Sequence, residues 1–218
     1  MGCCGSYCVA TARHFDDAVA KKDLERYLRE GPDLTTRLLL SSLRGSALQA
    51  STLLDVGGGI GAVSFELLAT GIGSATLVDA SPSYLQMAGV EAQRRKIETR
   101  LNLVLGDFVA VVDRLSVADI VVLDRVVCCY PDYVALLENA LAHCRGLLAL
   151  SYPRDTLYGR AMIWVENLVR RVKGDEFRAF VHPAAALEAI VQESGFRRLS
   201  RSSTWVWCAD VYSKARAA

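Results

Sequence analysis

The chain has 218 residues, with 25 Lys and Arg against 24 Asp and Glu and a formal net charge of +1. Hydrophobic residues make up 52% of it, enough for a full core, while 22% charged residues and few prolines exclude a largely disordered chain. The balanced charge argues against a protein whose main task is to grip nucleic acid through its phosphates.

No stretch of the sequence is apolar enough to cross a membrane. The most hydrophobic run, "ADIVVLDRVVCCY", is interrupted by Asp124 and Arg125, and the N-terminus has no basic region followed by an apolar one. We therefore expect a cytoplasmic protein without a membrane span. In that compartment the 7 cysteines are expected to be reduced thiols.

The first 50 residues are predicted to be helical. Leu24, Tyr27 and Leu28 repeat at helical spacing, and a second apolar helix is predicted from Leu34 to Leu43, after the Gly31-Pro32 break. From Ser51 the pattern changes to strands that alternate with helices. We therefore divide the chain into an N-terminal helical cap over 1–50 and an α/β domain over 51–218.

Five short apolar runs read as strands in this second part. They are "STLLDVG", "SATLVDA", "LNLVLGD", "ADIVVLD" and "GLLALSY". Nearly continuous apolar strands that alternate with helices are typical of a parallel sheet covered on both faces. The sequence therefore predicts an α/β fold, a Rossmann-like doubly wound sheet.

Helix signals separate these strands. Ser81-Pro82 supplies an N-cap and a first-turn proline for one helix. A helix after Pro131 is predicted to turn Val134, Leu137 and Leu141 to the core, and one after Pro183 to turn Leu187, Ile190 and Val191 inward. The tail "STWVWCADVY" alternates like a strand, with Trp205, Trp207, Ala209 and Val211 on one side.

The central motif is "LLDVGGGIGAVSFELL" at 53–68, which places Gly57, Gly59 and Gly61 at the turn from the first strand into a helix. Glycines let the backbone bend sharply there and let a ligand approach. Asp79 ends the second strand, where a carboxylate can accept hydrogen bonds from ribose hydroxyls. NAD and S-adenosylmethionine both bind to this layout.

Three features favour S-adenosylmethionine. Asp55 lies two residues before the first glycine, where its carboxylate would face a cationic amino acid and would repel a pyrophosphate. Asp107 follows the third strand in "GDF", within reach of an adenine amino group. The chain also has no separate substrate domain and no tyrosine followed four residues later by lysine, as a dehydrogenase would need.

Together, "LLDVGGGIG", the acid of "LVDAS", "GDF" and "ADIVVLDRVVCCYPD" resemble the class I S-adenosylmethionine-dependent methyltransferases. The resemblance implies a mostly parallel seven-stranded sheet with an antiparallel last strand. It also implies a substrate-covering insertion at 151–182. The cofactor-binding residues it implies are Asp55, Gly57, Gly58, Gly59, Gly61, Asp79, Ala80, Gly106, Asp107, Phe108 and Asp124.

The segment after the fourth strand faces the methyl donor, because ligands of open α/β sheets bind beyond the carboxyl ends of the strands. Asp124 and Tyr130 lie in this segment, and His182 opens a later helix. We predict these three as the catalytic side chains, with His182 as the base that deprotonates the acceptor. The block is most similar to small-molecule O-methyltransferases, so the expected partner is a small-molecule methyl acceptor, methylated at oxygen.

Three alternatives remain open at this stage. Cys3, Cys4, Cys8, Cys128 and Cys129 would supply thiols for methyl transfer to a thiol or a metalloid. The chain would otherwise be a catalytically inactive S-adenosylmethionine-binding module, or a hydride-transferring reductase. No bound metal is predicted, because neither a second carboxylate nor an Asn adjoins Asp124. The basic clusters read as solvated helix ends, so no nucleic-acid partner is expected.

Overall fold

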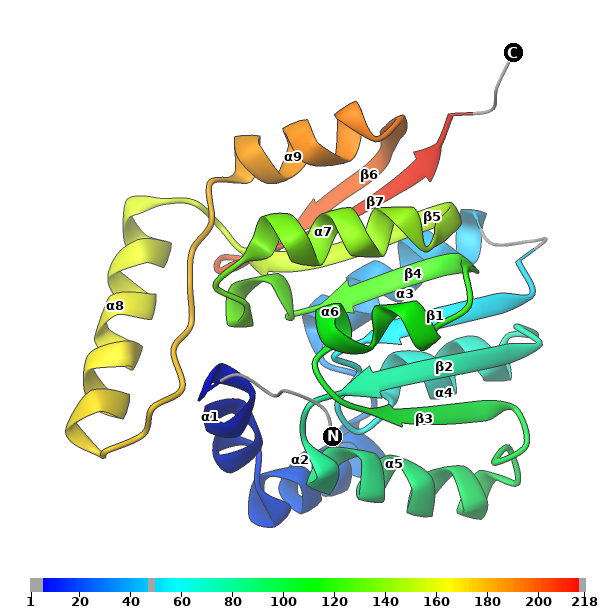
Figure 1. Cartoon of the computed structure of the whole chain (residues 1–218), viewed down its shortest axis with the longest axis horizontal. Helices are drawn as coiled ribbons and strands as arrows, with labels where there is room; N and C mark the ends of the chain where they lie inside the picture. The colour runs from blue at the N-terminus through cyan, green and yellow to red at the C-terminus, as the bar shows by residue number, and fades with distance from the viewer. Residues whose placement is uncertain (1–5, 47–49, 216–218) are drawn as a thin grey trace.

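A computed structural model describes residues 6–46 and 50–215 (Figure 1). Its centre is a 7-stranded sheet of order β3-β2-β1-β4-β5-β7-β6. The strands are β1 (Thr52–Val56), β2 (Ser74–Asp79), β3 (Leu101–Leu105), β4 (Ala118–Asp124), β5 (Cys144–Pro153), β6 (Phe196–Ser203) and β7 (Trp207–Lys214). Neighbours among the first five run parallel, and β7 runs antiparallel to both β5 and β6. The predicted mixed sheet with an antiparallel last strand is confirmed.

Helices precede the sheet and connect its strands. They are α1 (Ser6–His14), α2 (Asp17–Glu30), α3 (Leu34–Ser46), α4 (Ala62–Ala69), α5 (Pro82–Arg95), α6 (Phe108–Val111), α7 (Tyr133–Ala142), α8 (Leu157–Val172) and α9 (Ala184–Glu193), with 3-10 turns η1 (Val112–Arg114) and η2 (Val127–Cys129). The predicted start of α5 is confirmed, because the Ser81 side chain accepts a hydrogen bond from Tyr84 N at 3.2 Å and Pro82 follows.

Two hydrophobic cores lie on opposite faces of the sheet. One combines side chains of α2, α3, α4 and α5, among them Leu43 and Phe65, with strand residues such as Leu53. The other combines α6, α7 and α9, among them Leu137 and Val191, with the opposite side chains of the strands. This two-sided burial explains why the strands read as continuous apolar runs, and it confirms the doubly wound architecture.

Two details of the predicted packing are wrong. Val134 is 38% exposed, and α7 buries Leu137 and Leu141 together with Leu136 and Ala140 instead. The tail is also not one strand, because residues 204–206 form the turn between β6 and β7 and leave Trp205 88% exposed. A period-2 pattern continues unchanged through a short turn, so alternation alone did not locate the hairpin.

The N-terminal helices do not form a separate layer. Side chains of α3, Leu39 and Leu40 among them, share a core with the central strands, and α3 packs against β5 and β7. By contrast, α1 and α8 lie beyond the carboxyl ends of the parallel strands (Figure 1). Within residues 6–46 and 50–215, no helix combines the length and apolarity needed to traverse a bilayer. Because α1 and α8 lie beyond the carboxyl ends of the strands, they cover any ligand that binds at this edge of the sheet.

Candidate active site

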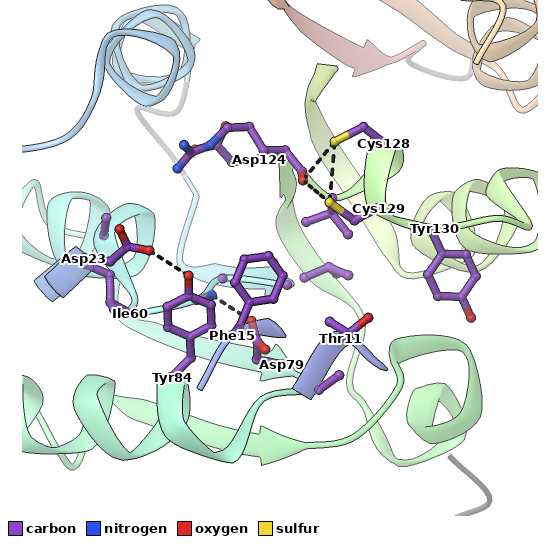
Figure 2. A pocket seen from close by; sticks show the side chains of 18 of the residues that line it. Thr11, Phe15, Asp23, Ile60, Asp79, Tyr84, Asp124, Cys128, Cys129 and Tyr130 are labelled. Atoms are coloured by element: carbon purple, nitrogen blue, oxygen red, sulfur yellow. Dashed lines mark hydrogen bonds between the residues drawn. The ribbon is translucent and has the colours of Figure 1, made fainter. Parts of the chain in front are cut away.

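A cavity of about 450 Å³ opens at the carboxyl ends of β1 to β4. Its floor comes from the loops after these strands, some of whose side chains Figure 2 shows. Its cover comes from α1, α2, α8 and the segment that follows α8, whose places in the fold Figure 1 shows. The volume falls within the range of small-molecule sites. Of the predicted site residues, these line the cavity: Asp55, Gly57, Gly58, Gly59, Asp79, Ala80, Gly106, Asp107, Phe108, Asp124 and Tyr130.

The glycine loop leaves no room for side chains where it passes the first strand. A Cβ at Gly58 would lie 2.7 Å from the Asp55 carboxyl carbon and 2.8 Å from Leu77 Cγ, so both buried side chains would have to move. Gly57 has a φ of 61°, a conformation that L side chains rarely adopt. Gly61, with a φ of 88°, does not line the cavity. It stands at the start of α4, where a side chain would crowd Phe65. The loop therefore exposes bare backbone to the cavity.

Asp55 is a buried carboxylate with one oxygen unused. It is 0% exposed, and its Oδ2 accepts a hydrogen bond from Ser64 Oγ at 2.7 Å, but its Oδ1 has no partner within the described part of the chain. Burial, together with the charges of Asp124 and Asp79, raises its pKa to about 7. A buried acceptor without a partner is costly. This arrangement therefore suits a ligand that brings a positively charged donor to Oδ1.

Asp79, at the end of β2, supports the glycine loop from below (Figure 2). Its Oδ2 accepts from Gly59 N at 2.9 Å and its Oδ1 from Ser81 N at 2.8 Å. Burial raises its pKa to about 6, although these backbone hydrogen bonds oppose the shift. A carboxylate has about four acceptor sites, so acceptor capacity remains for hydroxyl donors from the cavity.

Asp107 and Tyr130 form a pair at the other end of the floor. The Tyr130 hydroxyl lies 2.8 Å from Asp107 Oδ1 and 3.0 Å from Oδ2, and Asp107 also caps α6 by accepting from Val109 N. Phe108 follows and is 4% exposed. The structure thus places Tyr130 beside the predicted adenine region, where it orients Asp107.

Both carboxylate oxygens of Asp124, at the end of β4, accept hydrogen bonds. Oδ2 accepts from Thr36 Oγ1 of α3 at 2.5 Å, and Oδ1 accepts from Ser151 Oγ of β5 at 2.5 Å. Burial raises its pKa, while Arg125 opposes that shift. The next residue, Arg125, has a φ of 61° and pairs with Asp33 at 2.7 Å. Asp124 therefore lines the cavity as an anchor between the N-terminal helices and the sheet.

His182 lies outside the cavity lining. Its Nε2 is 3.0 Å from the Tyr130 carbonyl oxygen, and its ring centroid is 4.3 Å from that of Tyr133. Burial lowers its pKa, so the ring is neutral at neutral pH. In this position the imidazole holds the segment that carries Cys129 and Tyr130.

The cysteines that the structure describes near the donor edge are Cys128 and Cys129. Their sulfur atoms lie 3.6 Å apart, and both thiols donate to the Arg125 carbonyl at 3.3 Å (Figure 2). The contact with Cys129 and burial raise the pKa of Cys128 well above its ordinary value. Cys3 and Cys4 lie outside the described residues, as does the side chain of Cys8. Over the described part, no three metal-ligating side chains form a group.

Two side-chain pairs at the cavity escaped sequence reasoning. The Tyr84 hydroxyl donates to Asp23 Oδ2 at 2.7 Å, so α5 and α2 meet over the glycine loop (Figure 2). His14 Nδ1 lies 2.6 Å from Asp175 Oδ2, which joins α1 to the segment after α8. Tyr84 lies in the first turn of α5, shortly after Asp79, and this closeness in sequence could have predicted that it lies at the cavity. Nothing in the local sequence points to Asp23 or to the second pair.

Comparison with known proteins adds a family and a fold. A family model described as a methyltransferase domain matches residues 19–200. No curated protein matches the chain. Among solved structures, magnesium protoporphyrin IX methyltransferase from Synechocystis PCC 6803 with bound SAH has a TM-score of 0.72 at 17% identity, covering 95% of this chain and 99% of that one.

Two further structures show the same fold. An O-methyltransferase family protein from Burkholderia thailandensis has a TM-score of 0.74 at 14% identity, over 93% of this chain and 61% of that one. Human N-acetylserotonin methyltransferase in complex with SAM has a TM-score of 0.65 at 20% identity, over 94% of this chain and 58% of that one. At these identities the likeness concerns the fold.

Proposed function

Since the chain belongs to the methyltransferase-domain family, which uses S-adenosylmethionine as its methyl donor, we propose that it methylates a small molecule at oxygen. The observation that carries this proposal is the continuity of one cavity. The carboxylates and bare glycine loop of the donor region open into a space walled by Met162, Ile163, Phe177 and Trp207. A covered space of this size suits a small acceptor.

The donor region fits S-adenosylmethionine group by group. Asp55 Oδ1, the buried acceptor without a partner, receives the cationic amino acid end, and the glycine loop leaves room for it. Asp79 accepts from the ribose hydroxyls, beside Ala80. Gly106, Asp107 and Phe108 hold the adenine, with Tyr130 orienting Asp107. When bound, the donor supplies an electrophilic methyl group on a sulfonium, and the protein positions the acceptor and excludes water.

Oxygen is favoured over a metalloid as the acceptor. A metalloid would need protein thiolates to hold it, and the raised pKa of Cys128 keeps that residue protonated at neutral pH. Two of the similar structures are named for an O-methyltransferase family and for a methyltransferase of a porphyrin, a small ring compound. We assign Asp124 to positioning at the reactive end and Tyr130 to positioning Asp107 at the adenine, since both are held by hydrogen bonds within the protein.

Calorimetric titration with S-adenosylmethionine, its demethylated product and NADH in parallel tests the proposal. We expect the first two to bind and NADH not to bind. A screen of hydroxyl, carboxyl, thiol and arsenite acceptors for S-adenosylhomocysteine formation then tests the acceptor atom. Binding of NADH alone would contradict the methyltransferase assignment. Donor binding with no turnover on any acceptor in the screen would favour an inactive binding module.

Donor affinity is expected to rise with pH until about pH 7. Asp55, whose pKa is about 7, and Asp79, whose pKa is about 6, are protonated in acid, and the cationic donor binds their ionised forms better. Each pH unit between about 7 and 6 therefore costs up to about tenfold in affinity, each unit below about 6 up to about a hundredfold because both groups are protonated, and binding near pH 6 releases protons. Titrations between about pH 5 and 8, in buffers of different ionisation heat, measure both effects.

Asp55→Asn is the matched control for this pH dependence, because it keeps the shape of the side chain and removes the titration. The variant is expected to lose the slope between about pH 6 and 8 and to keep the one below pH 6, which belongs to Asp79. A wild-type affinity that does not change over the whole range would contradict the assignment of Asp55 to the cationic end.

A further inference from the structure

A histidine–carboxylate pair stands in the cover of the cavity. His14, the last residue of α1, lines the cavity, and its Nδ1 lies 2.6 Å from Oδ2 of Asp175, 161 positions away. Both side chains are 25% exposed. The other ring nitrogen, Nε2, has no hydrogen-bond partner among residues 6–46 and 50–215. One nitrogen is thus engaged by a carboxylate while the other stays available, as a proton-accepting imidazole requires.

The ring is held in place on several sides. Phe177 stacks on it at a centroid distance of 4.5 Å, and Phe15 meets it edge-on at 4.7 Å. Phe177 N donates to Asp175 Oδ1 at 2.9 Å, which fixes the carboxylate in turn. Partial burial opposes ionisation of Asp175, but the hydrogen bonds from Phe177 N and His14 leave its pKa lowered. An ionised Asp175 accepts from Nδ1–H, so the neutral ring presents Nε2 as the acceptor.

Other charged groups near the pair are already matched. Arg170 stacks over the Phe177 ring at 5.3 Å and pairs with Glu166 at 3.1 Å, and both residues line the cavity. Arg13 faces Glu176 at 3.5 Å at the exposed rim. Asp175 is therefore the charged group in direct contact with the His14 ring.

We infer that the acceptor is an aromatic hydroxyl and that His14, oriented by Asp175, takes its proton; this inference rests on the proposed function. The walls of the acceptor region, Trp207, Met162 and Ile163, suit a flat apolar ring. A phenol, with a pKa of about 10 as in tyrosine, gives its proton to an imidazole far more readily than an aliphatic alcohol does. A carboxylic acid is already ionised at neutral pH and needs no base.

The step balances without a further reactant. The acceptor O–H bond breaks, its proton goes to His14 Nε2, and its electron pair stays on oxygen. The oxygen forms a bond to the methyl carbon while the carbon–sulfur bond breaks, and that electron pair stays on sulfur and neutralises its charge. The proton then leaves the imidazolium to solvent at the rim.

The test uses 3-nitrophenol, whose phenolate absorbs visible light more strongly than the phenol does. The probe is added with S-adenosylhomocysteine to the full chain at about pH 7, where the free probe is mostly protonated and an imidazole can still accept a proton. We expect the wild type to develop the phenolate band. His14→Asn keeps a donor that can reach Asp175, so the contact between α1 and the 175–177 segment survives, but it has no group to hold the proton. It is expected to reduce the ionised fraction of bound probe about tenfold or more.

Arg13→Ala is the matched control, since it removes the neighbouring contact between the same two segments and leaves the cavity lining intact. It is expected to keep the band. A phenolate band that persists in His14→Asn would mean that the His14–Asp175 pair only joins two segments of the chain, and it would overturn the inference. So would loss of the band in His182→Asn with retention in His14→Asn, or failure of the wild type to bind the probe.

Failure of the proposed function is separable from failure of this inference. Calorimetry with S-adenosylhomocysteine on the same samples reports donor-site binding without any acceptor. If that ligand does not bind, the proposed function itself fails. If it binds normally and only the phenolate band is missing, the assignment of His14 and of an aromatic hydroxyl fails alone.

Discussion

Substituting Asp79 with alanine is expected to weaken S-adenosylmethionine binding by about two to four orders of magnitude. Two hydrogen bonds to a charged group are removed from the ligand, each contributing about 1.5–3 kcal/mol. The same change also leaves Gly59 N and Ser81 N without their acceptor, so the glycine loop loses its support. Calorimetric titration measures the donor affinity. Thermal unfolding of the free protein measures how much stability is lost when the glycine loop loses its support.

A second aspartate provides the comparison. Asp132 accepts from Ala135 N at 3.1 Å at the start of α7, and it is absent from the cavity lining. Asp132→Ala therefore also removes a carboxylate that accepts from the backbone, with an expected stability loss of about 1 kcal/mol and no change in donor affinity. If Asp79→Ala binds the donor as tightly as Asp132→Ala does, Asp79 has no role at the ribose.

The largest expected loss of stability comes from Arg201→Ala. Asp210 is 0% exposed in β7 and pairs directly across the hairpin with Arg201 of β6. Both carboxylate oxygens accept from the guanidinium at 2.7 Å, and Tyr152 and Tyr212 donate to Oδ2. Removing Arg201 leaves a buried carboxylate without its cation, so we expect the free energy of unfolding to fall by about 3–5 kcal/mol.

Urea unfolding of Arg201→Ala, of Arg160→Ala and of the double variant Arg201→Ala/Asp210→Asn, each against the wild type, identifies the cause of that loss. Arg160→Ala breaks the Asp155 pair, whose arginine side chain is 59% exposed, and is expected to cost far less stability than Arg201→Ala. Adding Asp210→Asn to Arg201→Ala removes the stranded charge while keeping an acceptor for the tyrosines, and is expected to recover most of the lost stability. If the double variant is no more stable than Arg201→Ala, the loss stems from packing of the arginine stem.

The fold was predictable because its signals are local. Apolar runs with both faces buried, the glycine turn and the Ser81-Pro82 cap each lie within a few residues of one another. The errors arose where local patterns are ambiguous. The alternation through Trp205 looks the same in a strand and in a tight hairpin, and Val134 has the same spacing as residues that are buried.

The sequence brings together the part of the cavity lining that lies at the ends of the parallel strands. Asp55 and Asp79 lie at the carboxyl ends of β1 and β2, Asp107 follows β3, and the carboxyl ends of parallel strands meet at one edge. The acceptor side depends on pairs that are remote in sequence. Thr36 reaches Asp124 across 88 positions, and His14 reaches Asp175 across 161, so neither contact leaves a trace in spacing. The choice of His182 as the base rested on the helix that begins after it, and its role stays a prediction.

The packing of α3 against β7 has a consequence for how the chain folds during synthesis. Residues 34–46 are synthesised long before the strand they pack against, residues 207–214. Apolar side chains of α3 therefore lack part of their packing partner on the nascent chain until β7 has been synthesised. Such a high contact order slows folding and prolongs exposure to aggregation and to chaperones. A ribosome-stalled chain lacking β7 is accordingly expected to be captured by holdases.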